Sequence, residues 1–238
     1  MTIRKKLNKT AEKMPYVGKV LTKDISIKDI GIVGIGAYMA LLNINPALGA
    51  NATAEVVSGA DANSNVSTTI DTKLSGEIAK RTNFFLRNRT SVRDDRTVDS
   101  FTVIDLSYAL GHGFDAVAET QYAPGAELDS RLGIQYFREI GKNFTAYALV
   151  TRNFNENPNT ELTGVLGYSK DINGKWKFVG RIEEVVNIAD ANYNYDLTRL
   201  RLGAGRGKFT IGPATDISEV GSGKKSTYMI GGSIGVKF

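Results

Sequence analysis

The chain has 238 residues, of which 42% are apolar and 23% charged, with a net charge of +5. Bulk composition is ordinary for a folded protein, and the length allows one or two domains. The absence of cysteine excludes disulfides, zinc-thiolate sites and thiol nucleophiles. Residues 1–52 hold eight basic and three acidic residues, so the rest of the chain is neutral and does not support a nucleic-acid-binding surface.

Residues 1–52 have the pattern of a secretory signal peptide with an extended basic n-region. The apolar run at 30–42 has about 13 residues, fewer than the roughly 20 that a spanning helix needs. A small-x-small motif, Ala50-Asn51-Ala52, follows this run. We therefore expect cleavage after Ala52, with an uncleaved membrane anchor as the alternative.

Residues 53–82 come next and are rich in Ala, Ser, Asn, Asp and Thr. They show no lasting hydrophobic period, which predicts a flexible lead-in segment. Within it, residues 74–82 are compatible with a short strand or with a helical turn.

From Asn83 onward the sequence predicts short β-strands separated by turn signals every ten to fifteen residues. Ile104, Leu106 and Tyr108, for example, alternate with Asp105 and Ser107. This alternation indicates strands with one apolar and one polar face. A change of parity near residues 198–199 predicts a β-bulge there. The expected strands are 83–92, 101–110, 114–122, 128–138, 144–154, 161–170, 176–187, 194–204, 208–213 and 226–238.

The connections between these strands alternate in length. Tight turns with Gly or Asn are expected at 111–113, 140–143, 172–175 and 205–207, and longer polar links at 93–100, 123–127, 155–159, 188–193 and 214–225. Aromatic residues fall beside both kinds of connection, as expected for two membrane-interface girdles. Phe114, Phe144, Trp176, Phe209 and Phe238 lie at the short turns or the terminus, and Tyr122, Phe154, Tyr193, Tyr195 and Tyr228 at the long links.

The last strand carries the most specific signal. Tyr228, Ile230, Ile234, Val236 and Phe238 share one parity, and the chain ends on the aromatic residue. This pattern resembles the C-terminal assembly signal of bacterial outer-membrane β-barrels, and the resemblance extends over residues 83–238.

The resemblance implies an all-β fold, a transmembrane antiparallel up-and-down barrel of about ten strands, with eight and twelve as the alternatives. It also implies residence in the bacterial outer membrane, with residues 53–82 in the periplasm. The implied partners are outer-membrane lipid and the barrel assembly machinery, and the oligomeric state stays open. Unpaired backbone groups cannot face hydrocarbon, which is why such a sheet must close.

The polar face of the predicted strands would line the bore and carries charges of both signs. One interpretation is a network of ion pairs that fills the bore of a structural barrel. The other is a narrow porin-like channel for passive diffusion of small solutes, in which the arginines would favour anions. The predicted bore charges are Arg87, Arg89, Asp105, Glu119, Asp129, Arg131, Arg181, Glu183, Arg199, Arg201 and Asp216.

Two other functional classes have weaker support. A barrel-embedded enzyme acting on lipid or surface substrates would need a Ser-His pair, but the single histidine, His112, lies in a predicted turn. A soluble ligand-binding barrel would place apolar residues inside and polar residues outside. Residues 190–195 and 221–226 lack key residues of a calcium loop and of a phosphate loop, respectively. We therefore expect no catalytic residue, metal or cofactor.

Overall fold

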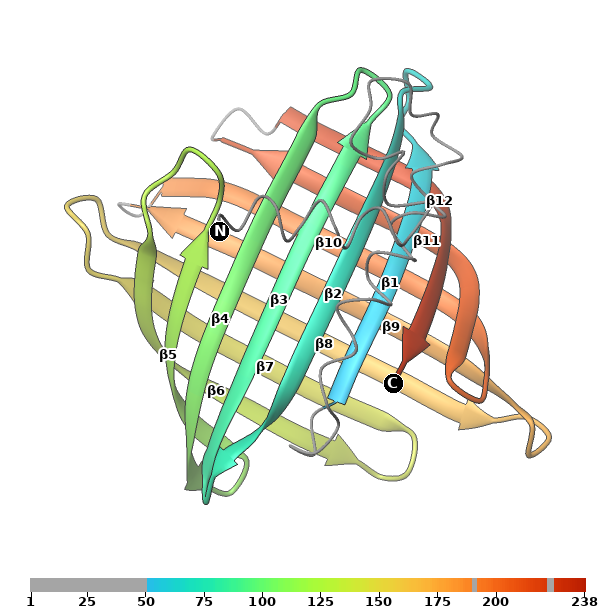
Figure 1. Cartoon of the computed structure of the whole chain (residues 1–238), viewed down its shortest axis with the longest axis horizontal. Coiled ribbons are helices and arrows are strands. Elements are labelled where there is room, and N and C mark those ends of the chain that lie inside the picture. Colours follow the sequence, from blue (N-terminus) through green and yellow to red (C-terminus); the bar gives the residue numbers. More distant parts are fainter. Residues whose placement is uncertain (1–50, 190–191, 222–224) are drawn as a thin grey trace, which may run out of the picture. The chain divides into compact units, whose positions relative to one another are not determined.

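The computed structural model describes residues 51–189, 192–221 and 225–238, which form one closed barrel of twelve antiparallel strands (Figure 1). Each strand pairs with its neighbours in the sequence, and β12 pairs with β1 to close the ring. None of these residues belongs to a helix of the length and hydropathy that a membrane crossing requires. The strands are β1 (Asn51–Ala60), β2 (Val66–Ala79), β3 (Thr82–Arg93), β4 (Val98–Gly111), β5 (Phe114–Tyr122), β6 (Asp129–Ile140), β7 (Phe144–Asn153), β8 (Asn159–Asp171), β9 (Trp176–Ala189), β10 (Asn192–Arg206), β11 (Phe209–Val220) and β12 (Lys225–Lys237).

The barrel has twelve strands. Twelve is one of the alternatives that the sequence predicts, and the main prediction of about ten strands is too low. The two additional strands are β1 and β2, so the expectation of a flexible lead-in at residues 53–82 is wrong. Small and hydroxyl side chains hide their alternation: Ser58 and Thr68 share a hydrogen bond of 3.0 Å where a typical membrane strand would carry Leu or Ile. The first two residues of β1 also belong to the expected leader, whose other residues lie outside the described part of the chain.

The two ends of the barrel differ in their connections. At one end, here called the turn rim, β2–β3, β4–β5, β6–β7, β8–β9 and β10–β11 are joined tightly, and both chain ends of the barrel lie there. His112, Gly141, Gly174 and Gly207 in these turns adopt φ between 56° and 71°. The turn-rim connections have two to four residues, whereas those at 61–65, 94–97, 123–128 and 154–158 at the opposite end, the loop rim, have four to six.

Two links at the loop rim are shorter than the sequence predicted, because the strands beside them continue further. Strand β9 runs to Ala189 and β10 starts at Asn192, so the predicted link at 188–193 is mostly strand. Strand β11 continues past Pro213 to Val220. Pro213 pairs with Gly232 of β12, whereas the register with β10 is interrupted between Arg201↔Ala214 and Ala204↔Ile211. The strand thus tolerates a proline that cannot donate a hydrogen bond to β10.

The outer surface of the barrel is apolar. Large side chains on different strands are more than half exposed, including Ile134 (55%), Leu166 (58%) and Ile230 (61%). Their sequence neighbours have the opposite parity and are less exposed; some, such as Gln135 and Gly231, are polar or small, and others, such as Met229, are apolar. This arrangement is the reverse of a soluble ligand-binding barrel and is the one that a bilayer requires.

Aromatic rings cluster on this outer face near the turn rim. Phe114 stacks against Tyr136 and Phe144 against Tyr168, each with ring centroids 4.7 Å apart. At the loop rim Tyr122, Phe154 and Tyr228 are exposed. The turn-rim residues Trp176, Phe209 and Phe238 are exposed too.

Tyr195 does not belong to the outer aromatic set, contrary to the sequence prediction. Its hydroxyl donates a hydrogen bond to Glu161 of β8 inside the barrel. The β-bulge in β10 lies between Tyr193 and Tyr195, not near residues 198–199, so Tyr195 shares the inward parity of Arg199. Tyr193 lies beside a gap in the described residues, and its side chain is outside the description.

The closing strand β12 has the predicted faces. Tyr228, Ile230 and Ile234 are exposed on the outside, and Ser233 is buried on the inside. The backbone N–H of Phe238 donates to the Ala52 carbonyl at 2.9 Å, so the terminal residue is tied to the first strand. The predicted assembly signal therefore lies on the strand that closes the barrel, and Ile230, Ile234 and Val236 of this signal pair with β1.

Candidate functional site in the barrel interior

The ten charged residues named for the bore from Arg87 to Arg201 are all buried or half-buried. Glu183 is 1% exposed, and Glu119 and Arg131 are 4% exposed. Asp105 illustrates the cause of this burial. Its sequence neighbours Ile104 and Leu106 are exposed on the outer face, so Asp105 points into the barrel and is buried. Asp216 is buried as well.

An ion-pair network crosses the barrel and is here called the cross-bore bridge; it consists of Asp71, Lys73, Arg87, Arg181, Glu183 and Arg199. Arg87 on β3 contacts Glu183 on β9 with Nη1 and Oε1 2.8 Å apart. The two strands are six places apart in the ring of twelve, so they lie on opposite walls. Arg87 also binds the Asp71 carboxylate with two nitrogens, at 2.5 and 2.9 Å. Glu183 further pairs with Arg199 and, at 3.2 and 3.9 Å, with Arg181 and Lys73.

A second group of ion pairs joins the strands on either side of the seam. Asp216 of β11 pairs with Arg89 of β3 at 2.8 Å and with Arg201 of β10 at 2.6 Å. Arg201 also lies 3.2 Å from Glu55 of β1. Removing one member of a buried pair leaves a charge without compensation, which costs about 3–5 kcal/mol. These interactions therefore tie β1 to β10, and β3 and β10 to β11, as well as filling the bore.

The wall formed by β4 to β8 is acidic. Asp105 faces Glu119 in the β4–β5 register, and Gln121 donates hydrogen bonds to Glu119 and Glu161 at 2.8 and 3.2 Å. Arg131 is the basic residue of this group, 2.6 Å from Asp129. Charge is thus segregated, with cations concentrated on β2, β3, β9 and β10. Among the described residues no cluster of acidic side chains and histidine is arranged to hold a metal ion.

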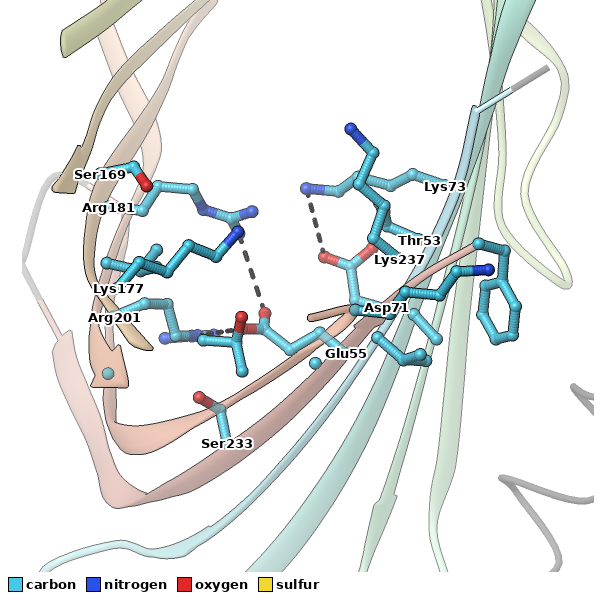
Figure 2. A pocket seen from close by; sticks show the side chains of 18 of the residues that line it. Thr53, Glu55, Asp71, Lys73, Ser169, Lys177, Arg181, Arg201, Ser233 and Lys237 are labelled. Carbon is cyan, nitrogen blue, oxygen red and sulfur yellow. Dashed lines mark ion pairs between the residues drawn. The ribbon is translucent and has the colours of Figure 1, made fainter. Parts of the chain in front are cut away.

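A cavity of about 490 Å³ lies inside the barrel at the turn rim. Figure 2 shows Lys177, Arg181 and Arg201 on one side, facing Lys73 and Asp71 on the other, with Glu55 below them. Basic lining residues outnumber acidic ones, because Lys208 and Lys237 also contribute and Glu55 and Asp71 are the acidic members. Within the described chain, neither Lys177 nor Lys237 has a carboxylate within ion-pair distance. The cavity is therefore a pocket of positive potential that ends at the cross-bore bridge.

Several interior residues escaped sequence reasoning. Glu55, Asp71 and Lys73 were missed because residues 53–82 were assigned to a lead-in. The pair Asp71 and Lys73 nevertheless alternates with Ile70 and Leu74, and that alternation was the available signal. Lys177, Glu161 and Lys237 lie on correctly predicted strands but were not named among the bore charges.

The single histidine is not brought together with the nearby serine and carboxylate of β4. His112 is exposed in the β4–β5 turn, whereas Asp105 and Ser107 are buried on the inward face of β4. The stretches weighed as calcium and phosphate loops lie partly outside the described residues, at 190–191 and 222–224.

No model of a protein family matches the sequence, and no curated protein matches it significantly. Solved structures match its fold. The NanC porin has a TM-score of 0.50 at 11% identity, and the match covers 78% of this chain and 98% of the porin. The KdgM porin has a TM-score of 0.48 at 11% identity, and the match again covers 78% of this chain and 98% of the porin. An outer-membrane channel from Pseudomonas putida F1 has a TM-score of 0.41 at 10% identity, covering 79% of this chain and 94% of that one. The closed ring of twelve strands and the likeness to the NanC porin together show the fold of a bacterial outer-membrane β-barrel.

Proposed function

We propose that this protein resides in the bacterial outer membrane and acts as a narrow porin-like channel for passive diffusion of small solutes, with a preference for anions. The turn rim would face the periplasm and the loop rim the exterior. The bore charges predicted from the sequence, together with Glu55, Asp71 and Lys73, would line the path.

The observation that carries this proposal is the positive cavity at the turn rim. Lys177 and Lys237 present ammonium groups to it without a protein carboxylate in ion-pair distance, as judged within the described residues. Unpaired cations in a narrow, water-accessible space attract anions and repel cations, which is how basic rings make a pore anion-selective. A bore designed only for packing would instead pair these charges or replace them with apolar groups.

Planar-bilayer recording of the refolded protein tests the proposal. We expect discrete conductance steps. In a KCl gradient, we expect a reversal potential displaced toward the chloride equilibrium potential. The double variant Lys177→Gln/Lys237→Gln should reduce the chloride preference. Lys170 is exposed and lies outside the cavity lining, so Lys170→Gln should leave the preference unchanged. A flat current from a correctly folded barrel in every salt would refute the channel.

A structural barrel is the second candidate, favoured by one specific observation. The cross-bore bridge joins opposite walls, so side chains occupy the middle of the bore. Such a barrel would give the flat current described above while retaining the heat-modifiable gel mobility of a folded outer-membrane barrel. The recording therefore separates the two functions.

Delivery to the outer membrane would depend on a cleaved signal peptide and on the terminal strand. We expect Phe238→Ala to reduce insertion, because the resemblance assigns this residue to recognition by the barrel assembly machinery. Phe209→Ala is the matched control, since Phe209 is also an exposed aromatic residue at the turn rim. Cell fractionation with detergent extraction measures the inserted amount, and equal insertion of the two variants would contradict the assignment.

A further inference from the structure

Glu183 occupies a position that no other carboxylate of the described barrel shares. It receives Arg87 from the opposite wall, and Arg181 and Arg199 from its own side. Its side chain is among the most buried of the barrel. Arg87 is the matching arm from β3, and it is held in place by the two-nitrogen contact with Asp71. These two side chains meet in the middle of the bore.

The charges around this meeting point do not balance. Lys73, Arg87, Arg181 and Arg199 contribute four positive charges to the cross-bore bridge, and Asp71 and Glu183 contribute two negative charges. Glu55 lies 3.8 Å from Arg181 but is shared with Arg201, so positive charge remains in excess. Loss of the Glu183 charge makes the bridge more positive, and loss of the Arg87 charge makes it less positive. Either loss also removes the Arg87–Glu183 ion pair between opposite walls, and loss of Glu183 removes its contact with Lys73 of β2 as well.

We propose that Arg87 and Glu183 form the selectivity constriction of the channel, the point that sets both its conductance and its ion preference. This inference rests on the proposed channel function. The Arg87–Glu183 pair closes the direct path between the turn-rim cavity and the loop rim. Ions pass where the bridge leaves room, and they meet its net positive charge as they do so.

The structure supplies a control one residue away. Glu184 follows Glu183 in β9 but has the opposite parity, so it lies on the outer face. There it accepts a hydrogen bond of 2.7 Å from the Thr198 hydroxyl of β10. Glu184→Gln thus removes the same charge from the same strand without touching the bridge.

The test records single channels of the full barrel carrying Glu183→Gln, Arg87→Gln or Glu184→Gln, each first checked for heat-modifiable mobility. Both bridge variants should raise the conductance at least about twofold over the wild type, because the spanning pair is lost. The chloride-to-potassium permeability ratio should rise in Glu183→Gln and fall in Arg87→Gln, by about twofold each. Glu184→Gln should match the wild type in both quantities.

Opposite shifts in permeability ratio separate a constriction from a general loss of packing, which would move both variants the same way. If Glu183→Gln does not fold, Arg87→Gln and its predicted shift toward potassium decide the question alone. A folded bridge variant that matches Glu184→Gln, or stays silent, overturns the inference. A silent wild type together with conducting bridge variants would overturn the proposed wild-type channel while leaving the constriction supported.

Discussion

Deleting residues 53–82 is expected to abolish barrel formation. This deletion removes nearly all of β1 and β2 and keeps the remaining ten strands, which are the ones apparent from the sequence. It leaves one gap in the ring with two free strand edges, because β12 loses its eight register pairs with β1 and β3 loses its pairing with β2. Each backbone group left unpaired in hydrocarbon costs several kcal/mol, so the open sheet cannot remain in a bilayer.

The remaining strands also lose the charges that neutralise their interior. Asp71 no longer binds Arg87, and Glu55 no longer lies beside Arg201. Re-pairing of β3 with β12 into a smaller barrel would bury these arginines without their partners. We therefore expect no heat-modifiable band and no protease-resistant product in outer-membrane fractions.

A control for the deletion changes the same region without removing a strand. Replacing Lys80 and Arg81 by Asn-Gly keeps the two-residue β2–β3 turn, and Arg81 already has a φ of 68°, which glycine adopts freely. That variant should fold like the wild type. Normal mobility of the deletion variant would show that β1 and β2 are not needed for closure.

The sequence is informative about this fold wherever strand faces differ strongly. Residues 104–108 show clear alternation, and β4 has the predicted faces. Strands β1 and β2 were missed because their outer faces carry Ala54, Ser58 and Thr68, which give little contrast with the inner face. The turn between them did leave a signal: Asp61 accepts backbone hydrogen bonds from Asn63 and Asn65, at 2.8 and 2.9 Å. Such a side-chain-to-backbone pattern is typical of a turn.

The pairing of the interior charges could not be predicted without the correct strand number. In a ring of ten strands beginning at residue 83, the wall opposite Arg87 would be the strand at 161–170. In the ring of twelve it is β9, which carries Glu183. The two residues are 96 positions apart in the chain, and local periodicity contains no information about such a contact. Alternation thus predicts which charges point inward, but only the closed topology identifies their partners.

The seam between β1 and β12 provides the second prediction with a large effect. Gly231 faces Gly59 across this seam, and a Cβ at Gly231 would lie 1.9 Å from the Ser58 carbonyl oxygen and 2.4 Å from the Gly59 Cα. These neighbours are backbone atoms of a paired strand, so they cannot move aside as a flexible side chain would. Gly231→Ala should therefore separate β1 from β12 and destabilise the barrel by about 3 kcal/mol or more.

Gly232→Ala is the matched control, because a Cβ there meets its nearest neighbour, the Gly212 carbonyl oxygen, at 3.7 Å. We expect its free energy of unfolding to stay within about 0.5 kcal/mol of the wild type. Urea unfolding in lipid vesicles, followed by the fluorescence of the single tryptophan, Trp176, measures both variants. Gly231→Ala should also lose heat-modifiable mobility first on warming, since an open seam exposes two strand edges at once. Equal stability of the two alanine variants would mean that closure does not depend on the close approach of β1 to β12.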